Sequence, residues 1–178
     1  MGYNARTANL LSAPPLFVAV VSAVFFGWLG DRLHKRAPLI AAQSLICIFG
    51  LSLTAFCTGN NSIRYLGIFF CNIGCQGNIP AVLAYQANNI RLQSKRSVGS
   101  ALQTAFQALG GIMAATTFRQ VDAPRYLPGL AATAGLQVVL LILLSAMTCY
   151  FWRVNRNAAR GLAGGHAVEG LQGFQYTL

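Results

Sequence analysis

The sequence predicts an all-α, polytopic membrane protein with five transmembrane helices, and three observations support this fold class. Only 9% of the 178 residues are charged and 55% are apolar, whereas soluble domains carry roughly 25% charged residues. Five runs of 19 to 26 residues contain no Asp, Glu, Lys or Arg, and a helix needs roughly 20 residues to cross a bilayer. The alternating polarity of barrel strands is absent. In lipid, each segment must satisfy its own backbone polar groups, so these runs should be helices.

Each expected helix is bounded by charged or polar residues. The five cover residues 10–29, 38–56, 65–86, 98–118 and 127–152. The first ends abruptly before Asp31 and three bases, as a membrane helix does where it meets the cytoplasm. The third is interrupted by Gly74, Gly77 and Pro80, and such interruptions free backbone groups where a cavity can use them. The fifth ends at Trp152, where an interfacial aromatic anchor belongs.

The basic residues predict the orientation of the helices. Nine of the thirteen Lys and Arg side chains lie in residues 30–37, in residues 87–97 and in the tail after Trp152. The remaining four are Arg6, Arg64, Arg119 and Arg125. Because cytoplasmic loops carry the excess of bases, the first group should face the cytoplasm in a multi-pass membrane protein. The bases lie at the ends of apolar runs and are not interleaved with aromatic residues, so we expect membrane lipid and not nucleic acid as the partner.

Residues 1–157 are expected to form one partial transmembrane bundle. Residues 158–178 are basic and then rich in glycine, with too little apolar surface to pack. We therefore predict that 158–178 form a disordered cytoplasmic tail.

The five cysteines lie in or beside apolar runs and lack the paired spacing of a zinc site. Cys71 and Cys75 are four residues apart on one expected helical face, so a metal-binding pair is conceivable. The favoured interpretation is that the cysteines are small packing residues, and no metal and no cofactor are expected.

The segment Gly27 to Arg36 carries the strongest resemblance to a known family. Its Gly27, Asp31, Arg32 and Arg36 resemble the short cytoplasmic loop motif of the major facilitator superfamily of transporters. The resemblance implies that the glycine permits close helix approach and that the charges hold one conformation. His34 departs from the motif, since the superfamily usually has glycine at that position. We predict that Asp31 pairs with Arg32, Arg36 or Arg96 or lies at the N-terminus of a neighbouring helix, and that a Cβ at Gly27 would clash with another helix.

Three further stretches are similar to one branch of that superfamily, the fungal anion:cation symporters that include allantoate and nicotinate permeases. The stretches are Ala8–Pro15, Gly77–Asn89 and Ser94–Gln103, the last followed by Asp122–Tyr126. Their order implies that the chain corresponds to helices eight to twelve of a twelve-helix transporter. The first seven helices would then be missing partners.

The resemblance implies a fragment of a secondary transporter that moves a small organic anion across the plasma membrane. The alternative is a truncated or remnant membrane subunit that does not transport. An enzyme is not expected, and no catalytic residue is assigned, because no cluster of catalytic groups lies within the expected spans. No ionisable Asp, Glu, Lys, Arg or His lies there either, so no proton-carrying group is expected in this part of the transporter.

Neutral polar side chains form two stripes in the expected spans. Asn72, Gln76 and Gln86 share one face of the third, and Ser100, Gln103, Thr104 and Gln107 share one face of the fourth. Amides in hydrocarbon need partners, so both stripes should face protein or a wet cavity. The simpler interpretation is hydrogen bonding between helices. The family position of the third helix implies that Asn72 and Gln76 bind substrate, with Gln103 and Gln107 near the seam between the two halves.

Other residues in these spans are expected to have structural roles. Asn78 points away from the Asn72 stripe and is treated as structural. Gly67 with Cys71, and Ala101 with Ala105, are small residues four positions apart, and close helix packing is their expected role.

Overall fold

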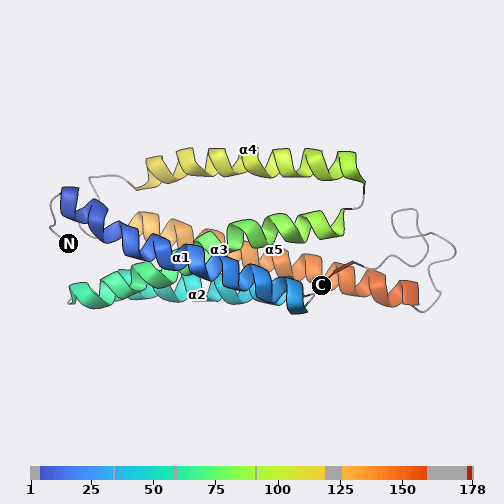
Figure 1. Cartoon of the computed structure of the whole chain (residues 1–178), viewed down its shortest axis with the longest axis horizontal. Helices are drawn as coiled ribbons and strands as arrows, with labels where there is room; N and C mark the ends of the chain where they lie inside the picture. Colours follow the sequence, from blue (N-terminus) through green and yellow to red (C-terminus); the bar gives the residue numbers. More distant parts are fainter. Residues whose placement is uncertain are drawn as a thin grey trace.

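The protein is a bundle of five long helices, seen in a computed structural model that describes residues 5–33, 35–57, 60–90, 92–118, 126–159 and 176–177. The helices are α1 (Ala5–Leu33), α2 (Ala37–Phe56), α3 (Asn61–Asn89), α4 (Gln93–Thr117) and α5 (Leu127–Ala159). Their axes run roughly side by side, and successive helices alternate in direction (Figure 1). The prediction of five helices is thus confirmed.

Most of the helices are longer than the uncharged runs that predicted them. α1 continues past Asp31 to Leu33, and α5 continues past Trp152 to Ala159. Charged residues end the part of a helix that suits lipid, but they do not end the helix itself, because Arg has a good helix propensity. Pro14 and Pro15 lie inside α1, and Pro80 lies inside α3.

Four of the helices are long and apolar enough to cross a membrane, not five. Within the described residues these candidate spans are Asn9–Leu33, Ala37–Phe56, Asn61–Asn89 and Leu127–Asn157. The fourth expected span, 98–118, forms α4 but does not meet this criterion, and the prediction of five spanning helices needs this correction. Residues 98–118 include no Asp, Glu, Lys or Arg, yet the Ser, Thr, Gln and Gly residues among them lower the mean hydropathy of the segment. A run without charged residues can therefore still be too polar to count as a candidate membrane span.

The alternating directions bring particular connections to the same end of the bundle. The connections from α1 to α2 and from α3 to α4 lie at the end where α5 finishes (Figure 1). This is the grouping that the basic residues predicted. Several of those residues, Arg91, Arg119, Arg125 and Arg160, and the motif residue His34, lie outside the described part of the chain.

α2 and α3 pack through glycines on both helices. A Cβ at Gly50 of α2 would lie 2.5 Å from the backbone nitrogen of Cys71, and one at Gly74 of α3 would lie 2.7 Å from the backbone nitrogen of Cys47. Contacts this short exclude any side chain, so the two backbones touch where glycine allows it. The prediction that Gly67 and Cys71 form a close-packing pair is confirmed, because both lie against Gly50.

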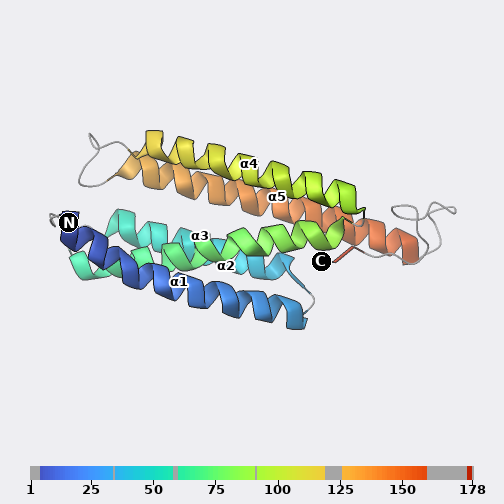
Figure 2. The ribbon, with the colours of Figure 1, turned by 45° about the horizontal axis from the view of Figure 1, so that its top comes forward.

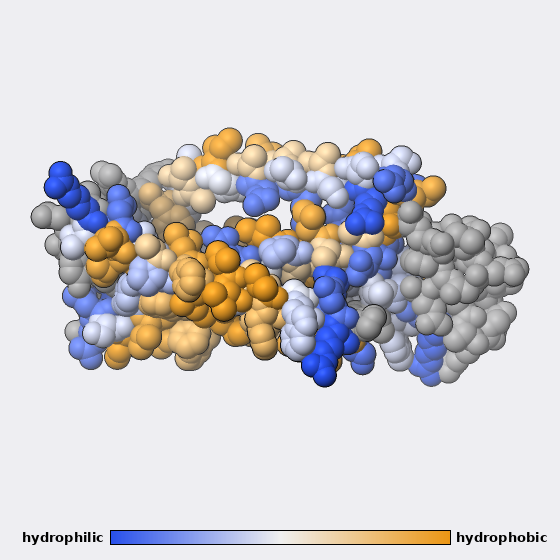
Figure 3. All heavy atoms as spheres, in the orientation of Figure 1, coloured by the Kyte–Doolittle hydropathy of each residue, from blue (hydrophilic) through white to orange (hydrophobic). Residues whose placement is uncertain are grey.

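α4 stands apart from the other helices. None of its residues is buried, and its main contacts are with α3 and α5. The ribbon views show it displaced from the layer of α1 and α2 (Figures 1 and 2). The space-filling view shows an opening beneath it, with hydrophilic side chains along the side of α4 that faces the opening (Figure 3). The small-residue stripe of α4, including Ala101 and Ala105, is exposed and does not form a tight helix contact within this chain.

Two residues of the segment 158–178, for which a disordered tail is predicted, lie against the bundle: Tyr176 and Thr177. The rings of Tyr176 and Phe151 are stacked with centroids 4.4 Å apart. The backbone N–H of Tyr176 donates to Oδ1 of Asn155, and that of Thr177 donates to Oδ1 of Asn89. α5 also extends two residues past 157. Residues 160–175 and 178 lie outside the described part of the chain.

Candidate functional site

The charged loop between α1 and α2 forms an ion pair. Nη2 of Arg36 donates to Oδ1 of Asp31, which confirms the predicted pairing of Asp31 with a nearby base. The Asp31 side chain is 70% exposed, so the pair contributes only about 0–1 kcal/mol to stability. Arg32 instead lies over the ring of Trp28, 5.3 Å from its centroid. The pair is thus better suited to fixing the loop conformation than to holding the fold together.

Gly27 does not have the packing role expected of it. No heavy atom of the described residues lies within 4 Å of the position that a Cβ would occupy, so the predicted clash with another helix is wrong for this part of the chain. The reason is that α1 stands away from α2 and α3 at this level and leaves a cavity of about 250 Å³. Gly27 lines that cavity together with Gly30, Asp31 and Arg36.

Replacing Gly27 by Ala is therefore expected to raise stability by up to about 1 kcal/mol, because alanine favours the helical conformation over glycine by about that amount and the new methyl group meets no described neighbour. Thermal unfolding of the purified chain in detergent measures this. A marked loss of stability would show that another surface packs on Gly27.

Gln43 of α2 is a polar residue at this cavity that the sequence interpretation missed. It is fully buried and lines the cavity, and neither Nε2 nor Oε1 of its amide has a hydrogen-bond partner among the residues that the structure describes. Its side chain fills the space left by Gly77 of α3. Next to it, Ser44 accepts a hydrogen bond from Nδ2 of Asn78 at 3.0 Å. Adjacent polar residues at 43 and 44 within an apolar run were the available sequence signal.

The buried Asn78 agrees with its predicted structural role, separate from the polar stripe of α3. Within that stripe, Asn72 is half-buried and its Nδ2 donates to the carbonyl of Ile68 at 2.9 Å. Gln76 is exposed. Gln86 packs on Gly99 at the start of α4, where any Cβ would collide with its amide. Gln86 therefore follows the simpler interpretation, contact between helices.

The amides of α4 differ in their surroundings. Gln103 is half-buried and its shielded Oε1 has no hydrogen-bond partner in the described ranges, whereas Gln107 is exposed. In the part of the chain that the structure describes, no hydrogen bond joins these two residues to Asn72 or Gln76. Among the described residues, the four predicted substrate-binding side chains are therefore not joined to one another by hydrogen bonds across the two helices.

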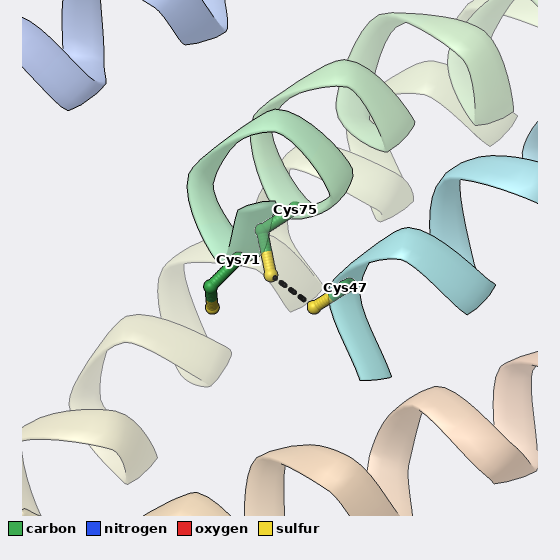
Figure 4. A group of neighbouring side chains, drawn as sticks. All are labelled: Cys47, Cys71 and Cys75. Atoms are coloured by element: carbon green, nitrogen blue, oxygen red, sulfur yellow. Dashed lines mark hydrogen bonds between the residues drawn. The ribbon is translucent and has the colours of Figure 1, made fainter. Parts of the chain in front are cut away.

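The structure adds a third thiol to the pair that the sequence singled out. Cys47 of α2 lies beside Cys71 and Cys75 of α3, and the three Sγ atoms all lie within 4.8 Å of one another (Figure 4). Spacing along the chain could not reveal this, because Cys47 belongs to another helix. All five cysteines are free thiols.

Comparison with known proteins shows that the chain is similar to part of several fungal transporters. It is 28% identical over 140 residues to an uncharacterized transporter of Schizosaccharomyces pombe, covering 78% of this chain and 28% of that protein. It is 26% identical over 165 residues to the MFS-type transporter cnsO of Penicillium expansum, covering 90% and 32%. It is 24% identical over 156 residues to the high-affinity nicotinic acid transporter of Saccharomyces cerevisiae, covering 87% and 29%. No family model and no solved structure matches the chain.

These relatives are named as transporters and not as enzymes, which supports a transporter of the major facilitator type. Together with the four apolar helices, they support a multi-pass membrane protein. The chain spans about a third of the length of the relatives it matches. The activity of those whole proteins therefore reaches this chain only as a proposal.

Proposed function

We propose that this chain is the C-terminal part of a secondary transporter of the anion:cation symporter kind, moving a small organic anion across the plasma membrane. The missing N-terminal helices would supply the opposite wall of the transport path. Similarity over nearly the whole chain to about a third of several named transporters supports this proposal. In such proteins the substrate site lies near the bilayer midplane, between the two halves.

The polar side of α4 is the observation that carries the proposal. α4 has no buried residue, and its hydrophilic side chains face the opening beneath it (Figure 3). A helix of mixed polarity is unfavourable in lipid, because unsatisfied amides cost free energy there. It is favourable where one face lines a water-filled path and the other contacts lipid or protein. We infer that α4 is the fifth membrane-spanning helix of the intact transporter and lines its path.

The proposed substrate contacts are the amides of α3 and α4. Asn72 and Gln76 would donate hydrogen bonds to a carboxylate, and Gln103 and Gln107 would lie near the seam between the halves. Neutral amides can orient an anion but cannot neutralise it, so the opposing charge would come from the N-terminal helices. Gly27, Asp31, Arg32 and Arg36 would hold one conformation at the cytoplasmic end, with the observed Asp31–Arg36 pair as the contact that breaks on switching.

The test uses this chain joined to the N-terminal helices that its relatives carry, with labelled nicotinic acid as the first substrate because one relative is named for it. Replacing Asn72 or Gln76 by Ala is expected to raise the half-saturation concentration about 10- to 100-fold. A hydrogen bond to a charged group contributes about 1.5–3 kcal/mol, and 1.4 kcal/mol is tenfold. Uptake is measured at matched surface expression.

Ser145→Ala on α5 is the matched control. Its hydroxyl bonds to the carbonyl of Leu141 in its own helix at 2.8 Å, so its loss should leave uptake unchanged. If both amide variants keep the wild-type affinity and rate, the polar stripe of α3 serves helix packing and not substrate binding.

The alternative function is a non-transporting membrane subunit. The large apolar side chains that α1 and α4 expose, including Phe17 and Phe106, favour contact with further helices as well as with lipid. The two functions differ in one experiment. A subunit would co-purify with an intact transporter and change its uptake, whereas the proposed fragment would transport only when joined to the N-terminal helices.

A further inference from the structure

Three thiols from two helices converge at the closest part of the α2–α3 interface. This thiol cluster consists of Cys47, Cys71 and Cys75. Sγ of Cys47 lies 3.1 Å from Sγ of Cys75, and all three sulfur atoms lie within 4.8 Å of one another (Figure 4). Cys47 is fully buried and the other two are partly buried.

The cluster follows from the local sequence. Cys71 and Cys75 are one turn apart, so their side chains project from the same side of α3. Gly74 lies between them and against Cys47, where a Cβ would meet the Cβ of Cys47 at 2.6 Å. Because glycine stands at 74, α3 approaches α2 closely enough for a cysteine of α2 to reach both thiols.

The donor set suits a soft metal ion. α2 and α3 contain no Asp, Glu or His, so sulfur is the only strong ligand atom at this level. Thiolates select Cu(I) and similar soft ions over hard cations. Zinc–sulfur bonds are about 2.3 Å long. Three sulfur atoms arranged in one plane around an ion at that bond length would lie about 4 Å from one another. The observed separations, from 3.1 Å up to the 4.8 Å limit, bracket that value.

Charge favours a monovalent ion. Binding of Cu⁺ with release of one thiol proton forms a site with no net charge: one thiolate and two thiols hold one positive ion. Zn²⁺ would need two protons released for neutrality, and it prefers a fourth ligand. Within a membrane-spanning bundle a net charge is costly. Gln137 of α5 assists the proton loss, because its Nε2 lies 3.6 Å from Sγ of Cys75 and can donate to a thiolate there.

We propose that Cys47, Cys71 and Cys75 form a three-sulfur site for one Cu(I) ion, which clamps α2 to α3. The proposal does not depend on the transport activity. It differs from simple packing, in which the thiols only fill space, and from a redox pair, in which Cys47 and Cys75 form a disulfide.

The experiment uses the full chain, purified in lipid nanodiscs, reduced with a phosphine and freed of reductant without oxygen. Cu(I) is titrated in competition with the chromophoric chelator bicinchoninate. One equivalent should bind, and X-ray absorption should show copper surrounded by sulfur alone. Each of Cys47→Ser, Cys71→Ser and Cys75→Ser should weaken binding by about tenfold or more, since the loss of groups that merely orient metal ligands already costs about 10- to 100-fold.

The control variants are Cys57→Ser and Cys149→Ser, which remove free thiols outside the cluster and should bind copper as the unaltered chain does. Circular dichroism checks that each variant stays helical. If Cys47→Ser does not fold because Cys47 is buried, the copper affinity of Cys71→Ser tests the proposal, since Cys71 is only partly buried. Three results would overturn the proposal: equal binding by cluster and control variants, copper bound through nitrogen or oxygen, or a Cys47–Cys75 disulfide in the purified chain that forms without copper.

Discussion

Replacing Gly50 by Ala should destabilise the packing of α2 against α3. The new Cβ would lie 2.5 Å from the nitrogen of Cys71, 2.7 Å from the carbonyl oxygen of Gly67 and 2.9 Å from the carbonyl carbon of Phe70. All three are backbone atoms, so no side chain can rotate away. The helices would have to move apart, and overpacking of this kind costs about 1–3 kcal/mol or more. The gain of about 1 kcal/mol in helix propensity offsets only part of this cost.

The measurement is the unfolding midpoint of the chain in mixed detergent micelles as the fraction of a denaturing detergent is raised. Gly135→Ala on α5 is the matched control, because no heavy atom of any described residue lies within 4 Å of its Cβ position. It adds the same methyl group to another apolar helix without a steric cost. If both variants unfold at the same midpoint, the close approach of α2 and α3 does not exist in solution.

The existence and number of the helices followed from the sequence for a simple reason. A charged side chain in lipid is costly wherever it falls, so an uncharged run of about 20 residues has one favourable structure. Whether α4 spans the membrane could not be predicted from the absence of charge in the same way. Its polar side chains are favourable or unfavourable in a membrane according to what lies opposite them, and the sequence of α4 does not contain that information.

The packing of the glycines was only partly predictable. Gly67, Cys71 and Gly74 follow the spacing of four and three residues that defines one helical face, as do Gln43, Cys47 and Gly50 on α2. Only Gly67 and Cys71 were recognised. Gly27 was expected to pack against another helix because it belongs to the loop motif. A sequence motif, however, does not give the local distance between two helices. The cavity beside it and the buried amide of Gln43 depend on that separation.

The candidate site shows the same division. The Asp31–Arg36 pair was predictable, because a carboxylate next to bases within one short loop has few other partners. The thiol cluster was not, because the sequence cannot place Cys47 of α2 beside two residues of α3 about a full helix away. The docked end of the tail was also missed, since composition describes a whole segment and cannot identify the two residues in it that find partners.

The contacts of that tail should protect two particular backbone amides from hydrogen exchange. The N–H of Tyr176 donates to Oδ1 of Asn155 at 2.9 Å, and Nδ2 of the same Asn155 donates back to the carbonyl of Tyr176. Oδ1 of Asn89 accepts from both the N–H and the hydroxyl of Thr177. Asn89 is buried, and its Nδ2 is held by the carbonyl of Tyr85, so its acceptor is fixed in place.

Asn89→Ala and Asn155→Ala should therefore release the tail, and in a specific order. Each variant loses a side chain that makes two bonds to the tail, at about 0.5–1.5 kcal/mol per bond. Asn89→Ala should raise the exchange rate of the Thr177 amide about 10-fold. Asn155→Ala should raise the exchange rate by about as much, but first at the Tyr176 amide. The stacking of Tyr176 on Phe151, with the rings only 13° from parallel, remains in both variants and should preserve some protection. The double variant should lose most of it.

Asn157→Ala is the control, because this asparagine is exposed and lies on the same final turns of α5. Exchange is followed residue by residue by NMR in detergent, with the amides of the α2–α3 interface as an internal reference for global stability. Rapid exchange of Tyr176 and Thr177 in the unaltered chain would mean that the tail is not docked. Equal loss of protection in all three single variants would mean that the whole bundle opens, and that the two asparagines do not hold the tail in particular.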